Sequence, residues 1–440
     1  MISDLKDDDF SVVYKSLLDL FPDRPWLRYV GSLEHQLRET PLMRSFLWRK
    51  NLIAYGLCEY ERYGVRPPSA ESWDAIKSAM IFASQVVFLG HVASSTGNLE
   101  GRRKLIGRVR HAIKKPDGMR GMRLELLVAT HLSRQGCEIQ WMEEDVGLGT
   151  FDLLAGVPGA GFVEVECKSI SADRGEALTE EEFHLLVDPI LHIIQPRLRE
   201  VERHFFAIDI TFLSRPPRGR ALEPFIEKIV DAVFRARSDE GVYEMPGVCQ
   251  VRVVLSDLRN EVAEGEALTC DEACGVADHL LGLGQGFRFI KSFGDECYLS
   301  IDFRTSVPSK FETMLGEVAK VAVRCQLTGT RPGCLVVGVE RHSGASLAEF
   351  AHEEFDVLAL RATKLLRGNP HLASVVFVSA PSFERVENVA GGWDAAVGAR
   401  AHEGAEEKLV SEGELSRTYV FDNPEGHYPH LRLSQLFGVT

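Results

Sequence analysis

The chemically most informative stretch of this sequence is one short strand candidate, residues 162–168, which reads Phe-Val-Glu-Val-Glu-Cys-Lys. Its apolar and β-branched residues, and the glycines before it, are typical of a buried strand. Because side chains alternate along a strand, Glu164, Glu166 and Lys168 should project from one face. Charged groups on a buried face are costly unless they pair or bind a ligand. The alternative is an edge strand with a solvated charged face.

A further carboxylate is expected beside this strand. Asp152 lies in a second strand candidate, residues 150–154. The Gly- and Pro-containing turn at 156–161 predicts a hairpin between the two strands. We therefore expect Asp152 to lie next to Glu166.

A third carboxylate lies on a predicted helix, residues 119–135. Helical spacing places Glu125 on the stripe that also holds Met122, Ala129 and Leu132, which should face the core. An acidic residue among core positions is an exception that can mark a functional site. We therefore add Glu125 to the candidate site.

Three carboxylates near a lysine suit a hard divalent cation. Mg²⁺ binds one or two protein carboxylates and keeps oxygen ligands from water and phosphate. Such a metal polarises a phosphate and lowers the pKa of a bound water. An ammonium alongside would stabilise the negative charge that develops on the phosphate oxygens. The group therefore predicts phosphodiester hydrolysis with Mg²⁺ or Mn²⁺ as cofactor.

The pattern of Asp152 followed, after a hairpin, by Glu166-Cys167-Lys168 resembles the Asp … Glu-x-Lys signature of the PD-(D/E)XK superfamily of restriction-endonuclease-like nucleases. The resemblance covers residues 119–213, and Phe151 stands where the family name has proline. It implies that Asp152 and Glu166 are metal ligands and that Lys168 is the catalytic lysine.

The same resemblance implies further properties. Glu125 matches a glutamate often found on the first helix of that fold, where it would be an auxiliary metal ligand or would position the site. The expected core has the order helix, three strands, helix, strand. The implied activity is that of an endonuclease in a restriction, repair or phage-defence setting. DNA is the expected substrate, and RNA stays open as the alternative. Glu164 has no assigned role.

The hydrophobic patterns predict an α/β protein with three regions. We expect a helical N-terminal region at residues 1–118, a mixed-sheet core at residues 119–215 and an α/β region at residues 216–440. The resemblance implies that the core is restriction-endonuclease-like. Two prolines should interrupt the helix that follows residue 179, and Pro116-Asp117-Gly118 should stop the helix before residue 119.

A basic segment precedes the predicted core. Between residues 101 and 123 there are nine basic residues and one acidic residue, although the whole chain has a net charge of −14. Such clustering predicts a contact with the phosphate backbone of a nucleic acid. A solvated helix face that pairs with acidic neighbours explains it equally well. The basic residues are Arg102, Arg103, Lys104, Arg108, Arg110, Lys114, Lys115, Arg120 and Arg123.

Composition limits the remaining classes of function. The nine cysteines are scattered, which fits a reducing cytoplasm better than a disulfide framework. We expect no apolar run long enough to span a bilayer, and hence no membrane partner. The chain also has no GxxxxGK[ST] motif. A second copy of the chain or another protein remains a candidate partner.

Two other functions stay open. The same fold could be a catalytically inactive scaffold or nucleic-acid-binding protein, in which case Glu166 and Lys168 should pair with each other and bind no cation. Alternatively, the C-terminal α/β region could bind a small molecule and regulate the rest of the chain.

Overall fold

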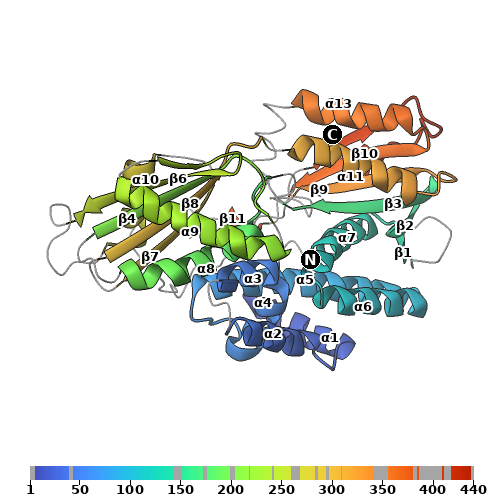
Figure 1. The fold of residues 1–440 in the computed structure, drawn as a ribbon. Coiled ribbons are helices and arrows are strands. Elements are labelled where there is room, and N and C mark those ends of the chain that lie inside the picture. Colours follow the sequence, from blue (N-terminus) through green and yellow to red (C-terminus); the bar gives the residue numbers. More distant parts are fainter. Residues whose placement is uncertain are drawn as a thin grey trace, which may run out of the picture. The chain divides into compact units, whose positions relative to one another are not determined.

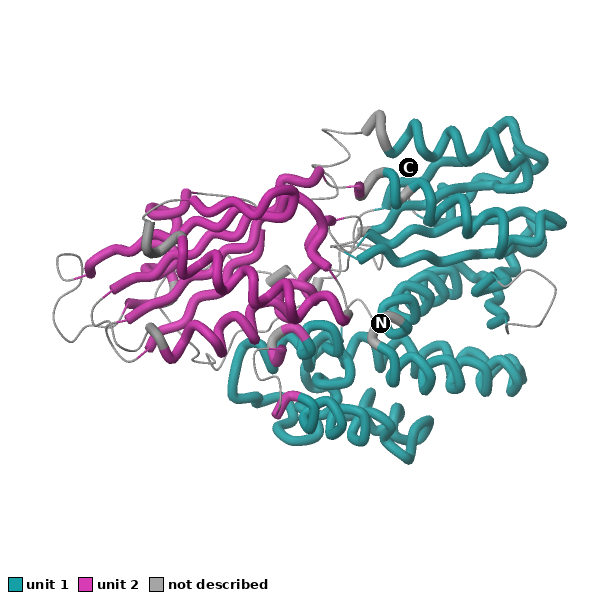
Figure 2. Tube along the Cα trace, viewed as in Figure 1, with its two compact units in different colours: residues 1–36, 47–172, 313–440 teal, residues 37–46, 173–312 magenta. Residues whose placement is uncertain are grey.

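The computed structural model describes most of the chain, and Figure 1 shows its elements. The chain divides into two compact units (Figure 2). Unit 1 comprises Met1–Gln36, Leu47–Ala172 and Thr313–Thr440, and unit 2 comprises Leu37–Phe46 and Asp173–Glu312. The described residues are 5–38, 43–142, 151–171, 176–198, 204–217, 219–239, 242–258, 268–282, 286–293, 297–308, 310–339, 355–379, 384–385, 409–410 and 418–437.

The N-terminal part of the chain is helical, as predicted. Its longest helix, α5, contacts α1, α4, α6 and α7, and Ser69 caps its start by accepting a hydrogen bond from the Ser72 amide at 3.1 Å. The six helices of this part are α1 (Phe10–Leu20), α2 (Pro25–Gln36), α3 (Arg44–Lys50), α4 (Leu52–Tyr63), α5 (Ala70–Ser95) and α6 (Leu99–Ile113).

Helix α5 corrects one expectation from the sequence. Among the described residues it alone is long and apolar enough to cross a membrane by length and composition, so the prediction that no such run exists is wrong. Within unit 1, however, 67% of its most apolar window is buried by the protein. A helix that is apolar around most of its circumference is also what the centre of a helical layer requires.

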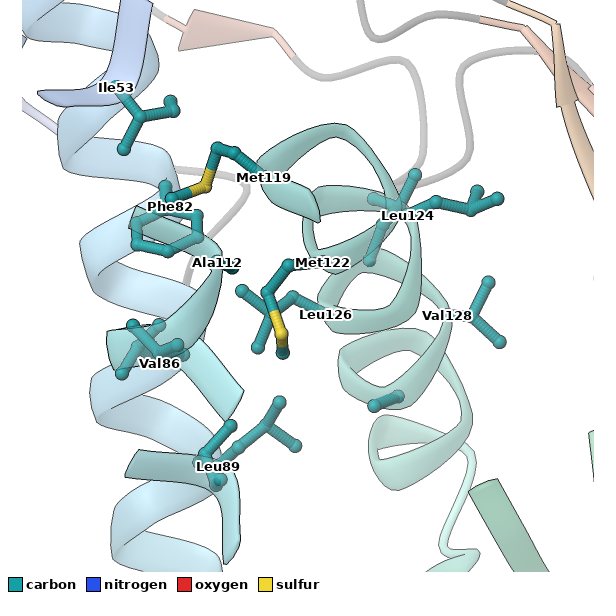
Figure 3. Packing of buried hydrophobic residues seen from close by; sticks show 14 of the residues in the cluster. Ile53, Phe82, Val86, Leu89, Ala112, Met119, Met122, Leu124, Leu126 and Val128 are labelled. Carbon is teal, nitrogen blue, oxygen red and sulfur yellow. The ribbon is translucent and has the colours of Figure 1, made fainter. Parts of the chain in front are cut away.

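Helix α7 (Pro116–Arg134) joins the helical layer to the larger sheet. On one side Met119, Met122 and Leu126 pack against α5 and α6, while Leu124 and Val128 point the other way (Figure 3). Gly338 allows this second side to approach the sheet closely, because a Cβ there would lie 3.0 Å from Leu124. This tight packing fixes the height of the neighbouring residue, Glu125, above the sheet.

The larger sheet belongs to unit 1 and has the order β1-β2-β3-β9-β10-β13. Strands β1, β2 and β3 form an antiparallel meander, β9 runs parallel to β3 and to β10, and β13 is antiparallel to β10. The strands are β1 (Glu138–Trp141), β2 (Leu153–Val157), β3 (Gly161–Ile170), β9 (Gly333–Val339), β10 (Leu372–Ser379) and β13 (Thr418–Asp422).

Helices cover both faces of this sheet. Helix α7 lies against one face, and α11 (Phe311–Cys325) and α13 (Phe355–Gly368) lie over the other (Figure 1). Val163, Val165 and Cys167 of β3 belong to the core shared with α7. A two-stranded ladder, β11 (Glu384–Arg385) with β12 (Leu409–Val410), is separate from this sheet.

Unit 2 is a second α/β layer structure with its own mixed sheet, of order β5-β6-β4-β8-β7. Helices α8 and α9 share one apolar cluster with the sheet, and α10 shares another. The elements are α8 (Glu180–Leu198), β4 (His204–Phe212), α9 (Leu222–Asp239), β5 (Val242–Met245), β6 (Cys249–Asp257), α10 (Cys270–Leu281), β7 (Gly286–Phe293) and β8 (Cys297–Thr305).

The α/β class is confirmed, with two mixed sheets and flanking helices, but the predicted region boundaries differ from the units of the structure. The strand predicted to complete the core after residue 204 is β4, which pairs with β6 and β8 in the other sheet. The strand beside β3 is instead β9. The larger segment of unit 2, Asp173–Glu312, is therefore inserted after β3, and unit 2 also includes Leu37–Phe46. The predicted regions, by contrast, meet at residues 118 and 215.

The two predictions made from prolines have different outcomes. Helix α6 ends at Ile113, before Pro116, as predicted. Pro116 itself occupies the first turn of α7, where its missing N–H has no intrahelical partner to lose. Helix α8 continues through Pro189 and Pro196, which were predicted to interrupt it. The capping box at its start is present, with the Glu182 amide donating to Thr179 Oγ1 at 3.2 Å.

Candidate functional site

The candidate site begins where the pairing of β2 with β3 ends. The last paired residues are Leu153 and Val165. Asp152 was predicted to lie inside the strand, but it comes directly before β2. Its Oδ2 accepts a hydrogen bond from the Cys167 amide at 2.9 Å. The side chain of Asp152 thus takes the place of a main-chain acceptor and lies against the backbone between Glu166 and Lys168.

Strand β3 supplies the second carboxylate and the amine. The Glu166 side chain is 0% exposed, and Lys168 Nζ lies 2.5 Å from its Oε1. Neither carboxylate oxygen of Glu166 accepts a hydrogen bond of ordinary geometry within the described part of the chain. A buried carboxylate with unused acceptor capacity is unusual, because such groups are normally satisfied.

Glu125 reaches the same cluster from α7 and is buried, as its helical stripe predicted. Its partner is Arg108 of α6, whose Nη2 lies 2.6 Å from Glu125 Oε2 and 3.0 Å from Asp152 Oδ1. The Nη1 of Arg108 donates to the Met142 carbonyl at 3.0 Å, and its guanidinium lies 5.7 Å from the ring centroid of Trp141. One arginine nitrogen therefore bridges two of the three carboxylates.

The carboxylates perturb one another electrostatically. Burial, reinforced by the charge of Asp152, raises the pKa of Glu166 to about 8 against the lowering effect of Lys168. Burial and Asp152 likewise raise the pKa of Glu125 to about 7, although Arg108 opposes them. Burial alone would lower the pKa of Arg108, but the two acids it bridges reverse that effect, so the guanidinium stays charged. These shifts place the four predicted site residues in one electrostatic cluster.

The donor set suits a divalent cation, although the described residues do not form a ready ligand cage. No three acidic, histidine or cysteine side chains among them are placed to hold a metal ion as they stand. Arg108 and Lys168 contact the three carboxylates instead. The Glu166 carboxylate, whose only recorded partner is Lys168, and the oxygen-only donor set nevertheless fit Mg²⁺ or Mn²⁺.

The nine basic residues of the segment 101–123 do not all have the role of a nucleic-acid contact or all that of a solvated, paired helix face. Arg108 belongs to the site, whereas Lys104 pairs with Glu100 at 3.2 Å and Arg110 with Asp23 at 2.8 Å, as a solvated helix face would. Arg102, Arg120 and Arg123 are half-buried. Three residues remain exposed as candidates for a nucleic-acid contact, namely Arg103, Lys114 and Lys115.

Sequence reasoning missed the place of Arg108 in the site and treated it as one basic residue among nine. The spacing of apolar residues along α6 nevertheless indicated its position. Arg108 lies three residues after Leu105 and four before Ala112, both of which are buried. Positions three and four apart share a helix face, so Arg108 borders the buried stripe.

Glu164, which had no assigned role, is a structural residue. It is 0% exposed, and its oxygens accept hydrogen bonds from the Thr328 amide at 2.8 Å and the Thr328 hydroxyl at 2.5 Å. Arg331 Nη1 lies 3.8 Å away. Glu164 therefore anchors the start of β3 to the loop that leads into β9 and is already satisfied there.

We expect Glu164→Ala to lower the free energy of unfolding of unit 1 by about 3 kcal/mol, because it leaves the Thr328 donors without their charged acceptor. Urea unfolding followed by tryptophan fluorescence measures this directly, since all five tryptophans lie in unit 1. Thr328→Val is the matched control. The double variant should lose less free energy of unfolding than the sum of the losses in the two single variants. A Glu164→Ala protein as stable as the wild type would contradict this role.

A charged cluster in unit 2 is fully occupied by internal pairing. Arg288 of β7 donates to Asp302 Oδ1 and Oδ2 at 2.8 and 2.6 Å and to Asp278 at 2.7 Å. Arg304 Nη2 donates to Asp302 at 3.2 Å, and its Nε lies 3.6 Å from Asp209. These pairs tie α10 to the sheet and leave no unused acceptor comparable to Glu166.

No protein-family model, curated protein or solved structure matches this chain.

Proposed function

We propose that unit 1 carries the active site of a metal-dependent nuclease of the restriction-endonuclease-like type, which hydrolyses phosphodiester bonds in DNA. The observation that carries the proposal is the meeting of Glu125, Asp152, Glu166 and Lys168 in one partly buried cluster. Buried acids are seldom gathered unless a cation or a reaction requires them.

The chain order of unit 1 supports the same proposal. Helix α7 is followed by the meander of β1, β2 and β3, and after the insertion of unit 2 come α11 and the parallel strand β9. This is the order of helix, three strands, helix and strand expected from the resemblance, with the last two elements supplied from further along the chain. The large insertion between β3 and α11 does not interrupt the segment that carries the site residues, because all of them precede it in the chain.

In the proposed reaction Asp152 and Glu166 would hold the divalent cation, with Glu125 as an auxiliary ligand. The cation, when bound, supplies charge neutralisation at the phosphate and a more acidic water. Lys168, whose side chain is 27% exposed, would turn its ammonium toward the phosphate and stabilise the added negative charge. The Cys167 amide holds the Asp152 carboxylate in place through its hydrogen bond.

Metal removal tests the proposal on the full chain. We expect nicking or linearisation of a supercoiled plasmid in Mg²⁺, loss of the activity in excess EDTA, and recovery on adding Mn²⁺. A single-stranded RNA in parallel reactions tests the preference for DNA. Equal cleavage with and without EDTA would contradict a metal-dependent site, and an absence of cleavage on both substrates would contradict a nuclease.

A second function is favoured by one specific observation. Glu166 and Lys168 pair at 2.5 Å, which is the arrangement expected of a metal-free scaffold or nucleic-acid-binding protein. Under that function the charge cluster serves only to join α6, α7 and the sheet. Calorimetric titration with Mn²⁺ separates the two functions. The scaffold takes up no cation, so wild type and Asp152→Asn should then give the same titration without binding heat.

A further inference from the structure

Arg108 makes an unusual contact for a structural arginine. A single nitrogen, Nη2, lies 2.6 Å from a carboxylate oxygen of α7 and 3.0 Å from a carboxylate oxygen at the start of β2. Arginines that only lock two elements together more often present two nitrogens to one carboxylate. One positively charged nitrogen is instead shared by Glu125 and Asp152, as a cation that bridged these two carboxylates would be.

The balance of charge allows only one positive group, either the guanidinium or a metal ion, between Glu125 and Asp152. Glu125, Asp152 and Glu166 are three acids, and Arg108 and Lys168 are the basic residues that contact them. With all three acids ionised and Arg108 in place, there is one negative charge in excess. A divalent cation at the same point would have to displace the guanidinium, because two positive groups cannot share it.

The exposure of the three side chains shows which of them can leave. The side chain of Arg108 is 27% exposed, whereas those of Glu125 and Asp152 are 11% and 15% exposed. Arg108 is therefore the most exposed of the three and is the one that can turn away with the least rearrangement of the core. Its contact with the Met142 carbonyl would keep the guanidinium close to the site.

We propose that Arg108 exchanges partners during the reaction, leaving Glu125 and Asp152 when a divalent cation binds and pairing with a phosphate of the nucleic acid instead. The inference rests on the proposed nuclease function and adds a phosphate-binding residue to it. A planar guanidinium matches the oxygens of a phosphate and remains charged throughout. Before the cation binds, the same residue neutralises two acids that would otherwise repel each other.

The exchange predicts two effects of opposite sign for Arg108→Met. Without the competing guanidinium, calorimetry should give a Mn²⁺ affinity about tenfold tighter than that of the wild type. Without the phosphate contact, affinity for a phosphorothioate-substituted DNA duplex in Mg²⁺ should be about tenfold weaker. A residue with a merely structural role would not produce tighter metal binding together with weaker duplex binding.

Two further variants keep the test independent of folding. Arg108→Lys retains the charge but lacks the bidentate fork, so its Mn²⁺ affinity should lie between those of the wild type and Arg108→Met. Arg110→Met removes an arginine from the same helix, where it pairs with Asp23, and should leave the Mn²⁺ affinity unchanged. Thermal melts establish that each protein is folded.

Trp141 offers a direct report of the movement, because its ring lies 5.7 Å from the guanidinium of Arg108. Titration with Mg²⁺ should produce a saturable change in tryptophan emission in the wild type. The change should be absent from both Arg108→Met and Trp141→Phe. A wild type that binds Mg²⁺ without this change would overturn the exchange.

The outcomes separate the inference from the function on which it rests. Equal Mn²⁺ affinity in the wild type and Arg108→Met would overturn the exchange and leave the nuclease site standing. Binding by Arg108→Met alone would mean that the guanidinium holds the position permanently, which overturns the exchange and favours the metal-free scaffold. An absence of binding in both proteins would overturn the nuclease site together with the exchange.

Discussion

Lys168→Ala is expected to lower Mg²⁺-dependent cleavage by roughly 10²- to 10³-fold, the usual effect of removing one group that stabilises developing charge. The ammonium of Lys168 lies 2.5 Å from Glu166 Oε1 and its side chain is partly exposed, so it can reach a phosphate held beside the acids. Rates of plasmid nicking under single-turnover conditions measure the loss. The defect should appear in the rate at saturating enzyme rather than in the concentration of half-saturation.

Two controls separate this effect from loss of the metal or of the fold. Removing an ammonium beside Glu166 should not weaken cation binding, so Mn²⁺ affinity should be equal to or tighter than that of the wild type. Lys77→Ala is the matched variant, because Lys77 pairs with Asp74 on α5 at 2.9 Å and lies outside the proposed machinery. It should retain cleavage within about twofold. Undiminished cleavage by Lys168→Ala would remove this residue from the proposed mechanism.

The residues of the site could be predicted from the sequence because the signals are local. The alternation along β3 and the turn before it place Glu166 and Lys168. The helical stripe of α7 places Glu125, which is buried as expected. Each of these depends on the side-chain period of one element or on a short turn, which are properties that sequence spacing determines.

The neighbour of β3 could not be predicted because sheet pairing is decided by contacts far apart in the sequence. Both β4 and β9 are apolar strands that follow a helix, and either would complete the expected order. The choice depends on an insertion of some 140 residues that brings β9 rather than β4 beside β3. Local patterns identify a strand but do not state which strand lies next to it.

Arg108 illustrates a different limit. A helix wheel shows that it borders the buried stripe of α6, but not whether its long side chain turns outward or inward. The direction is set by the acids of α7 and of the start of β2, which lie 17 and 44 residues away. Only the folded arrangement of three elements therefore distinguishes Arg108 from the exposed Arg103 and Lys114.

The stability of unit 1 is expected to depend strongly on pH, and the group responsible is Glu166. The folded protein holds this proton more tightly than the unfolded chain, because the pKa is raised from 4.5 to about 8. The resulting stabilisation is fully present below about pH 4.5 and is lost as the pH rises through 8. Without metal, the free energy of unfolding of unit 1 should therefore fall between pH 5.5 and 8.5, with Glu125 adding to the decrease.

Glu166→Gln should remove most of this dependence. The amide has nearly the shape of the protonated acid and no charge to bury, so the variant should match the wild type at pH 5.5 and exceed it by about 2 kcal/mol at pH 8.5. Urea unfolding in EDTA, followed by the tryptophans of unit 1, measures both values. Glu181→Gln, on the outer surface of α8 in unit 2, is the control and should leave the pH dependence unchanged.

Added Mn²⁺ should make the wild type more stable than Glu166→Gln at pH 8.5, the reverse of their order in EDTA. Binding requires ionised carboxylates, so Mn²⁺ should stabilise the wild type more at pH 8.5 than at pH 5.5. Glu166→Gln lacks one proposed ligand and should gain little at either pH. A wild type whose metal-free stability is flat between pH 5.5 and 8.5 would contradict the buried charge of Glu166. A Glu166→Gln protein stabilised by Mn²⁺ as strongly as the wild type would remove this residue from the proposed ligands, while leaving its effect on stability intact.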